Sequence, residues 1–197
     1  MDNSPAVDAK ALFASDTKVN ILPFAVMAGG WLAPLLKFWA LASGFHRPYD
    51  FPDGDYAPPL ALFAGAVLVS YACWWLPAGW YRPRRFERRL WPLFGVRLFR
   101  YLVPDGDLAN RWRRRREPGF RVVRNRAAAE VFLRRTVRSE QSHLMLLVFG
   151  AFSAVWAWHL GWNGWALFLT VGNVLVNLYP ILLQRYTRSR FPARFTG

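Results

Sequence analysis

The sequence is poor in cysteine, histidine and acidic residues, and each shortage excludes a class of site. Its 197 residues include one cysteine, Cys73, and three histidines. A single cysteine can form no internal disulfide and no cysteine cluster for zinc or an iron–sulfur centre. The sequence also has no His, Cys, Asp and Glu set with metal-ligand spacing, no glycine-rich loop after a strand and no G-x-S-x-G motif. We therefore expect no metal site and no permanently bound cofactor.

Basic residues far outnumber acidic ones, and apolar residues are abundant. The chain has 26 Lys and Arg against 12 Asp and Glu, which gives a formal net charge of +14. Hydrophobic residues make up 54% of the chain and aromatic residues 17%, with 11 tryptophans. A soluble domain rarely combines these features, whereas a membrane protein does so because apolar spans alternate with basic loops. The length fits one domain.

Four apolar stretches are long enough to cross a bilayer. They are about residues 19–42, 59–81, 143–162 and 164–184. Each meets the requirement of ~20 residues for a helix that crosses the hydrocarbon core. The first contains Pro23, Pro34 and Lys37, which predicts a kinked or partly interfacial course. The sequence therefore predicts an all-α integral membrane protein with about four transmembrane helices.

The distribution of arginine predicts the orientation. Residues 82–142 contain 18 Arg and 6 acidic residues, a net charge of +12, whereas loop 43–58 contains one Arg and three Asp. By the positive-inside rule, residues 82–142 and both termini face the cytoplasm. We expect an N-terminal cytoplasmic segment, residues 1–18, and a single four-span membrane domain, residues 19–197, with the large basic cytoplasmic segment 82–142.

The basic segment itself contains helical patterns. Residues 91–104 alternate apolar side chains with arginine and predict a short amphipathic helix on the inner leaflet. Residues 126–141 predict a helix that runs into the third span. The arginine run at 111–120 includes Trp112 and could bind nucleic acid. Beside four spans we favour a solvated or lipid-facing role, with membrane lipids and no nucleic acid as partners.

Two residues at the start of the third span could carry out proton transfer. Glu140 and His143 are three residues apart and share one face of a helix. A histidine can take a proton from an alcohol near neutral pH, and a carboxylate can orient the ring and stabilise its charged form. The alternative is a polar pair at a helix end, satisfied by water or lipid headgroups.

The predicted fourth span has a polar stripe, in which Asn173, Asn177, Pro180 and Gln184 follow one helical face. Polar groups within a bilayer cost free energy unless they are paired, so the stripe faces protein or a water-filled cavity. Hydrogen bonding between packed helices is the other interpretation. A short outward turn after the third span would make the two helices antiparallel neighbours.

Arg82, Arg84 and Arg85 follow the second span on the cytoplasmic side. Arginine can hold phosphate or carboxylate through bidentate contacts. Binding of lipid headgroups is the alternative, at ~1 kcal/mol per basic residue near an anionic leaflet.

Three segments resemble a known family. They read "WYRPRRFERRLWPLFGVRLFRYLVPDGD", "RSEQSH" and "NLYPILLQRYTRSR", in that order within about residues 75–190. The chain resembles the glycosyl-4,4'-diaponeurosporenoate acyltransferase family, small integral membrane proteins of bacterial carotenoid pathways. The more specific parts of the match are W-Y-x-P-x-R-F-E and N-x-Y-P-x-x-L-Q-R-Y, and the first 58 residues show no such resemblance. The resemblance implies transfer of a fatty acyl chain to a sugar hydroxyl of a glycosylated carotenoid, in a bacterial inner membrane.

We accordingly expect an O-acyltransferase that uses an acyl thioester of coenzyme A or of an acyl carrier protein. His143 would remove the proton from the acceptor hydroxyl, and Glu140 would orient its ring. Asn177, Gln184 or Arg185 would stabilise the oxyanion. The matching segments add Glu87 and Tyr179, with Asn173 from the polar stripe, as substrate-binding candidates. The alternative is a non-catalytic membrane subunit that binds a pigment or lipid within a larger complex.

Overall fold

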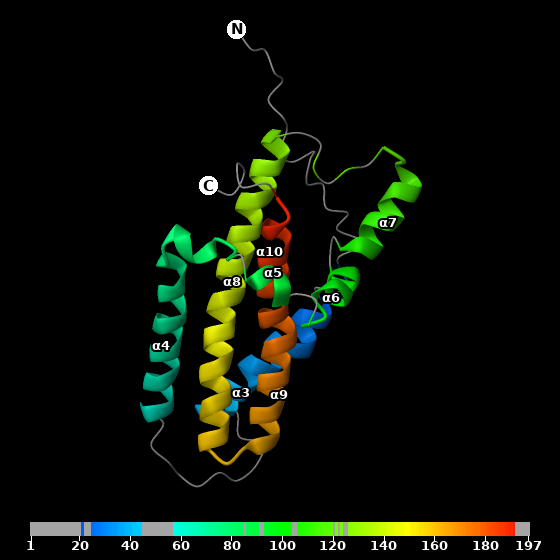
Figure 1. Ribbon diagram of the computed structural model, residues 1–197. Helices are drawn as coiled ribbons and strands as arrows, with labels where there is room; N and C mark the ends of the chain where they lie inside the picture. The colour runs from blue at the N-terminus through cyan, green and yellow to red at the C-terminus, as the bar shows by residue number, and fades with distance from the viewer. Residues whose placement is uncertain are drawn as a thin grey trace. The chain divides into compact units, whose positions relative to one another are not determined.

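The computed structural model describes residues 21, 25–44, 57–84, 86–90, 93–103, 106–119, 121, 123 and 126–191. Every regular element in these ranges is helical (Figure 1). Contacts divide the chain into two compact units. The apolar unit comprises Ala25–Trp80 and Glu140–Ile181, and the basic unit comprises Met1–Phe24, Tyr81–Ser139 and Leu182–Gly197. The limits of the basic unit's central stretch lie close to those of the predicted basic segment, 82–142.

The elements follow the chain in a simple order. In the apolar unit they are η1 (Ala28–Leu32), α3 (Ala33–Ala42), α4 (Ala57–Ala72), η2 (Cys73–Trp75), the later part of α8 (Arg126–His159), α9 (Asn163–Asn173), η4 (Val174–Leu178) and the start of α10 (Tyr179–Ser189). In the basic unit they are α5 (Glu87–Leu90), α6 (Val96–Leu102), α7 (Asp107–Arg116), the start of α8 and the end of α10. The short helix η3 (Ala78–Tyr81) lies at the boundary. The predicted all-α class is thus confirmed for the described ranges.

Among the described residues, three helices are long and apolar enough to cross a membrane, and they indicate a membrane protein. They span Ala25–Ala42, Arg126–His159 and Asn163–Ser189. The apolar helix Pro59–Trp75, in the predicted second span, is shorter, so a fourth crossing stays a prediction. The prediction that residues 126–141 continue into the third span is confirmed, because α8 is one helix of 34 residues.

Both apolar helices that contain an internal proline include one π-helical segment directly before it. Segment η1 ends two residues before Pro34, and segment η4 ends two residues before Pro180. In each case the residue before the proline donates its N–H five residues back, from Ala33 to Ala28 and from Tyr179 to Val174. Proline has no N–H to continue the α-helical ladder, and a π turn is one way in which a membrane helix adjusts to it.

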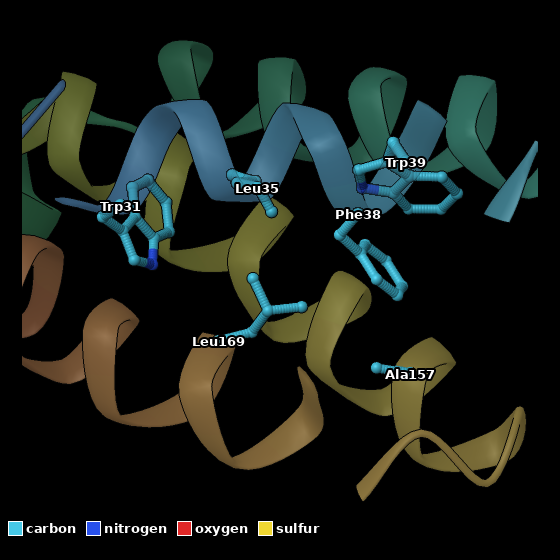
Figure 2. Packing of buried hydrophobic residues seen from close by; sticks show 6 residues of the cluster. All are labelled: Trp31, Leu35, Phe38, Trp39, Ala157 and Leu169. Carbon is cyan, nitrogen blue, oxygen red and sulfur yellow. The ribbon is translucent and has the colours of Figure 1, made fainter. Parts of the chain in front are cut away.

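The core of the apolar unit lies where α3 meets α8 and α9 (Figure 2). Its buried members are Trp31, Leu35, Phe38, Trp39, Ala157 and Leu169. The first four recur at helical spacing, so one face of η1 and α3 carries them toward Ala157 and Leu169. The indole of Trp39 also donates to Ser153 Oγ at 2.8 Å. Close packing and interhelical hydrogen bonds of this kind hold helices together in a bilayer, where lipid is as apolar as the side chains.

A tight turn joins α8 to α9. Gly161 has a φ of 73°, a left-handed conformation that glycine adopts without strain. The N–H of Trp162 returns to Ala157 O at 2.9 Å, and the N–H of Gly161 to Trp158 O at 2.9 Å. These bonds satisfy carbonyls at the end of α8 and reverse the chain. The turn therefore places α8 and α9 next to each other in the apolar unit, as predicted.

Candidate functional site

The imidazole of His143 meets a buried asparagine on the neighbouring helix. His143 lies on α8 and is half-buried, whereas Asn177 lies in η4 and is fully buried. Nδ1 of His143 is 3.3 Å from Oδ1 of Asn177. The structure therefore brings together two of the predicted catalytic residues, which are 34 positions apart in the sequence.

The hydrogen bonds continue from Asn177 through a second asparagine to the backbone. Nδ2 of Asn177 donates to Oδ1 of Asn173 at 2.8 Å, and Nδ2 of Asn173 donates to Leu147 O at 2.8 Å. Both asparagines are at most 5% exposed. We call His143, Asn177, Asn173 and the Leu147 carbonyl the asparagine chain. It begins and ends on α8, so it ties η4 and α9 to that helix.

The direction of the asparagine chain determines which imidazole nitrogen is protonated. A backbone carbonyl can only accept, so Asn173 must present its NH₂ group to Leu147. The Oδ1 atom of Asn173 then accepts from Asn177, which leaves the Oδ1 atom of Asn177 facing His143. An oxygen acceptor there requires a hydrogen on Nδ1. In the neutral imidazole Nε2 is therefore the basic nitrogen, because one ring nitrogen carries the proton and the other the lone pair.

Two local features position the asparagine chain. A Cβ atom on Gly150 would lie 2.6–2.8 Å from the side-chain atoms of Asn173, so only glycine leaves room for this amide. In addition, Pro180 follows the π-helical segment η4, which contains Asn177, and proline provides no N–H to the turn before it. The glycine and the proline thus each contribute to the place of the histidine.

Glu140 lies one turn before His143 on α8 and is 1% exposed. The sequence predicts that Glu140 orients the imidazole, and that role stays a prediction. The contact on Nδ1 comes from Asn177, which the sequence offers as an oxyanion donor. Both polar atoms of the Asn177 side chain take part in the asparagine chain. Positioning of His143 is therefore the role that its geometry favours.

Two other candidates, both in the basic unit, form an ion pair. Nη1 of Arg185 on α10 lies 2.8 Å from Oε1 of Glu87 on α5, and their side chains are 14% and 11% exposed. The sequence proposes both as substrate-binding residues but does not predict their pairing. Arg82 and Arg84 are exposed.

The remaining candidates have less specific surroundings. Nε2 of Gln184 donates to Ser139 Oγ at 3.2 Å within the basic unit. Tyr179 is half-buried at the start of α10, and Arg85 lies outside the described residues. No group of three or more His, Cys, Asp or Glu side chains in the described part of the chain is placed to hold a metal ion.

Sequence reasoning missed Arg188 and Thr136. Arg188 is 3% exposed, and its Nη1 is 3.4 Å from Oγ1 of Thr136 on α8, which in turn donates to Leu133 O at 2.7 Å. Arg188 follows Arg185 by three residues and so shares its helix face, a signal that could have placed it beside the ion pair. The basic unit therefore holds the buried Arg188 and the partly buried Arg185 near the carboxylate of Glu87.

Comparison with known proteins gives one match. A family model described as glycosyl-4,4'-diaponeurosporenoate acyltransferase matches residues 77–194. This range contains every catalytic and substrate-binding candidate of the sequence, and it agrees with the resemblance seen at about 75–190. Searches of curated proteins and of solved structures find no match.

Proposed function

The chain belongs to the glycosyl-4,4'-diaponeurosporenoate acyltransferase family, and we propose on that premise that it transfers a fatty acyl chain to a sugar hydroxyl of a glycosylated carotenoid or related glycolipid. The observation that carries this proposal is the asparagine chain. A general base for an alcohol needs a nitrogen lone pair held in a defined direction. A histidine whose Nδ1–H is held by a buried amide meets that need through Nε2.

The proposed reaction is a direct transfer without an acyl-enzyme. Nε2 of His143 takes the proton of the acceptor hydroxyl as its oxygen attacks the thioester carbonyl. The tetrahedral intermediate then collapses, the carbon–sulfur bond breaks, and the proton passes from Nε2 to the leaving thiolate. The ester and the free thiol are the products, and His143 returns to its neutral form. The only cysteine, Cys73, is not required in this scheme.

We propose an acyl thioester of coenzyme A or of an acyl carrier protein as the donor. Both carry phosphate, and the exposed Arg82 and Arg84 have the charge and the bidentate geometry that phosphate requires. Gln184 and Arg185 remain proposals for stabilising the oxyanion. The proposed setting is the cytoplasmic side of a bacterial inner membrane, with both termini in the cytoplasm.

The test is a pigment and glycolipid profile by mass spectrometry, from cells with the intact gene, a deletion and His143→Ala. We expect a species lighter by one acyl group in both mutants, and the lost mass identifies the chain. In membranes, His143→Ala should lower turnover by about 10²–10⁴-fold, the usual contribution of a general base. His159→Ala is the matched control, because His159 is an exposed histidine at the end of the same helix.

Full activity in His143→Ala would contradict the assignment of the base. If the deletion changes no acylated species but a membrane complex loses pigment or falls apart, the chain is a structural subunit instead. Extraction in mild detergent provides a second readout, since stoichiometric bound pigment or co-purified subunits would favour that alternative.

A further inference from the structure

Helices α6 and α7 of the basic unit form one fixed corner. Nη2 of Arg100 on α6 lies 2.6 Å from Oδ1 of Asp107, the first residue of α7. Between the two helices, a Cβ atom on Gly106 would collide with the backbone carbonyls of Arg100 and Val103. Gly106 therefore permits the tight connection that the ion pair reinforces. We call residues 93–103 and 106–116 the α6–α7 corner (Figure 1).

The corner is strongly basic. Residues 93–103 and 106–116 contain seven arginines and one aspartate, a net charge of +6, and that aspartate, Asp107, is the partner of Arg100. Arg97, Arg111, Arg114 and Arg115 are exposed. The guanidinium of Arg116 lies 3.5 Å from the ring centroid of Trp112, which holds this cation against an aromatic face.

The same corner exposes large apolar side chains. Leu93 is 79% and Leu98 is 69% exposed, and Phe94, Leu108 and Trp112 are exposed as well. Leu108 and Trp112 are four residues apart, so they lie on one face of α7. Arginines beside exposed leucine, phenylalanine and tryptophan are the composition of helices that lie in the headgroup region of a membrane.

We propose that the α6–α7 corner binds anionic phospholipids, with its arginines on the headgroup phosphates and its apolar side chains at the acyl boundary. An acidic carrier protein or a nucleic acid would satisfy the arginines. A nucleic acid offers phosphates but no acyl boundary for Leu93 and Leu98, and an acidic protein would need an apolar patch beside its charges, whereas the lipid interface satisfies both kinds of side chain. Lipid binding by the corner does not require the acyl transfer at His143, and only the carrier-protein alternative in the test is measured through that transfer.

The test places a spin label in the corner of the full chain. A Cys73→Ser, Leu98→Cys variant is reconstituted in nanodiscs of phosphatidylcholine alone or with 30% phosphatidylglycerol. The accessibility of the label to molecular oxygen, which concentrates in lipid, is compared with its accessibility to a water-soluble nickel chelate. We expect the label to be lipid-accessible only with phosphatidylglycerol, and to return toward water in 1 M salt, where the Debye length is ~3 Å. A label at the exposed Ala127 is the positional control.

Charge variants then separate lipid binding from general effects. Arg111, Arg114 and Arg115 are replaced together by Gln. This variant should need several-fold more phosphatidylglycerol for half of the change in label accessibility. The same three positions changed to Lys should keep most of the response, since the headgroup attraction is mainly electrostatic. The matched control replaces Arg121, Arg126 and Arg134 by Gln, and these three are exposed arginines outside the corner. It should leave the response unchanged.

Three results would overturn the proposal. The label could remain in water in both lipids, or it could enter neutral lipid equally well, which would remove the role of the arginines. In the third, the Gln variant would keep its lipid response but need a several-fold higher concentration of acyl carrier protein for half-maximal transfer. The corner would then be a docking site for that acidic protein.

Discussion

At the scale of single residues, His143, the proposed base, is held by two asparagines that come from another part of the sequence. Asn177 connects Nδ1 of His143 to Oδ1 of Asn173, at 3.3 and 2.8 Å. Removing its amide leaves a ring N–H and a carbonyl oxygen without this partner. A buried polar group that loses its partner costs about 1–3 kcal/mol. Position 177 should therefore affect both catalysis and stability.

We expect Asn177→Ala to lower kcat by about 10–100-fold, a loss of roughly 1.4–2.7 kcal/mol in transition-state stabilisation. KM for the acyl donor should stay unchanged, because the amide of Asn177 positions the proposed base, His143, and not the donor. Steady-state kinetics on protein in nanodiscs, normalised to the folded fraction, measure both quantities. Asn163→Ala, at an exposed position of α9, is the control. If turnover per folded molecule is unchanged in Asn177→Ala, this asparagine serves packing alone.

Gly150 provides a second test at this scale. A methyl group there would lie 2.6–2.8 Å from the amide of Asn173, so Gly150→Ala forces that side chain to move. Overpacking of this kind costs about 1–3 kcal/mol, and the displaced amide should also lower turnover. Gly65→Ala is the matched control, since Gly65 is helical and a Cβ atom there meets nothing within 4 Å. The unfolding temperature and the turnover should fall only for Gly150→Ala. Equal values for the two variants would contradict the proposed role of the contact between position 150 and Asn173.

At the scale of elements, the two internal prolines each follow a π-helical segment, but only one of these segments belongs to the candidate site. Pro34 and Pro180 each follow a π-helical segment by two residues. Only the segment before Pro180 contains a residue of the asparagine chain, Asn177, whose Oδ1 faces the imidazole of His143. π turns occur frequently at functional sites, because they rotate side chains out of the regular helical register.

Replacing each proline by alanine compares these two segments directly. Alanine supplies an N–H at position 180, which can bond the carbonyl four residues back and restore the α-helical register, so that Asn177 turns away from His143. We expect Pro180→Ala to reduce turnover while thermal stability holds or rises, because proline is unfavourable inside a helix. Pro34→Ala should keep its turnover. The idea fails if both variants lose activity in proportion to their stability, or if neither does.

At the scale of the whole molecule, the pair Glu87–Arg185 links α5 to α10 within the basic unit. Both side chains are less than 15% exposed, so little water screens the charges. Breaking a buried pair by removing one partner leaves a buried charge and typically costs about 3–5 kcal/mol. We expect Glu87→Gln and Arg185→Gln each to lower the stability by an amount near this range, measured by tryptophan fluorescence during thermal unfolding in detergent.

The double variant distinguishes a structural pair from a substrate site. Exchange of both residues for apolar ones, Glu87→Leu with Arg185→Met, removes both charges of the pair and should recover part of the stability, whereas the buried Arg188 loses the attraction of Glu87. If the pair is structural, activity returns with the stability. If Arg185 binds the substrate, turnover stays low in the stable double variant. A double variant less stable than Glu87→Gln would contradict the pairing itself, because both variants lose the attraction between Glu87 and Arg188.

The sequence by itself determined the class of the molecule and the location of its apolar helices. Local composition is enough for both features, because a span is a run of about 20 apolar residues in the sequence. The segments between these runs are recognised by their arginines. The sequence also predicted that the helix from residue 126 continues into the third span, as α8 does. The motifs within about residues 75–190 likewise predicted the range that the family model matches. So could the turn at Gly161, since glycine tolerates its positive φ.

Only the tertiary structure decided which polar residues meet. Glu140 and His143 are near in sequence, so a single-helix argument pairs them, whereas Nδ1 of His143 faces an asparagine 34 residues away. That contact depends on the register of η4 and on the space that Gly150 leaves, and neither is encoded in a residue's immediate neighbours. The pairing of Arg185 with Glu87 across 98 residues has the same origin. Hydrogen bonds and ion pairs act over about 3 Å, so their partners are fixed by how helices pack rather than by spacing along the chain.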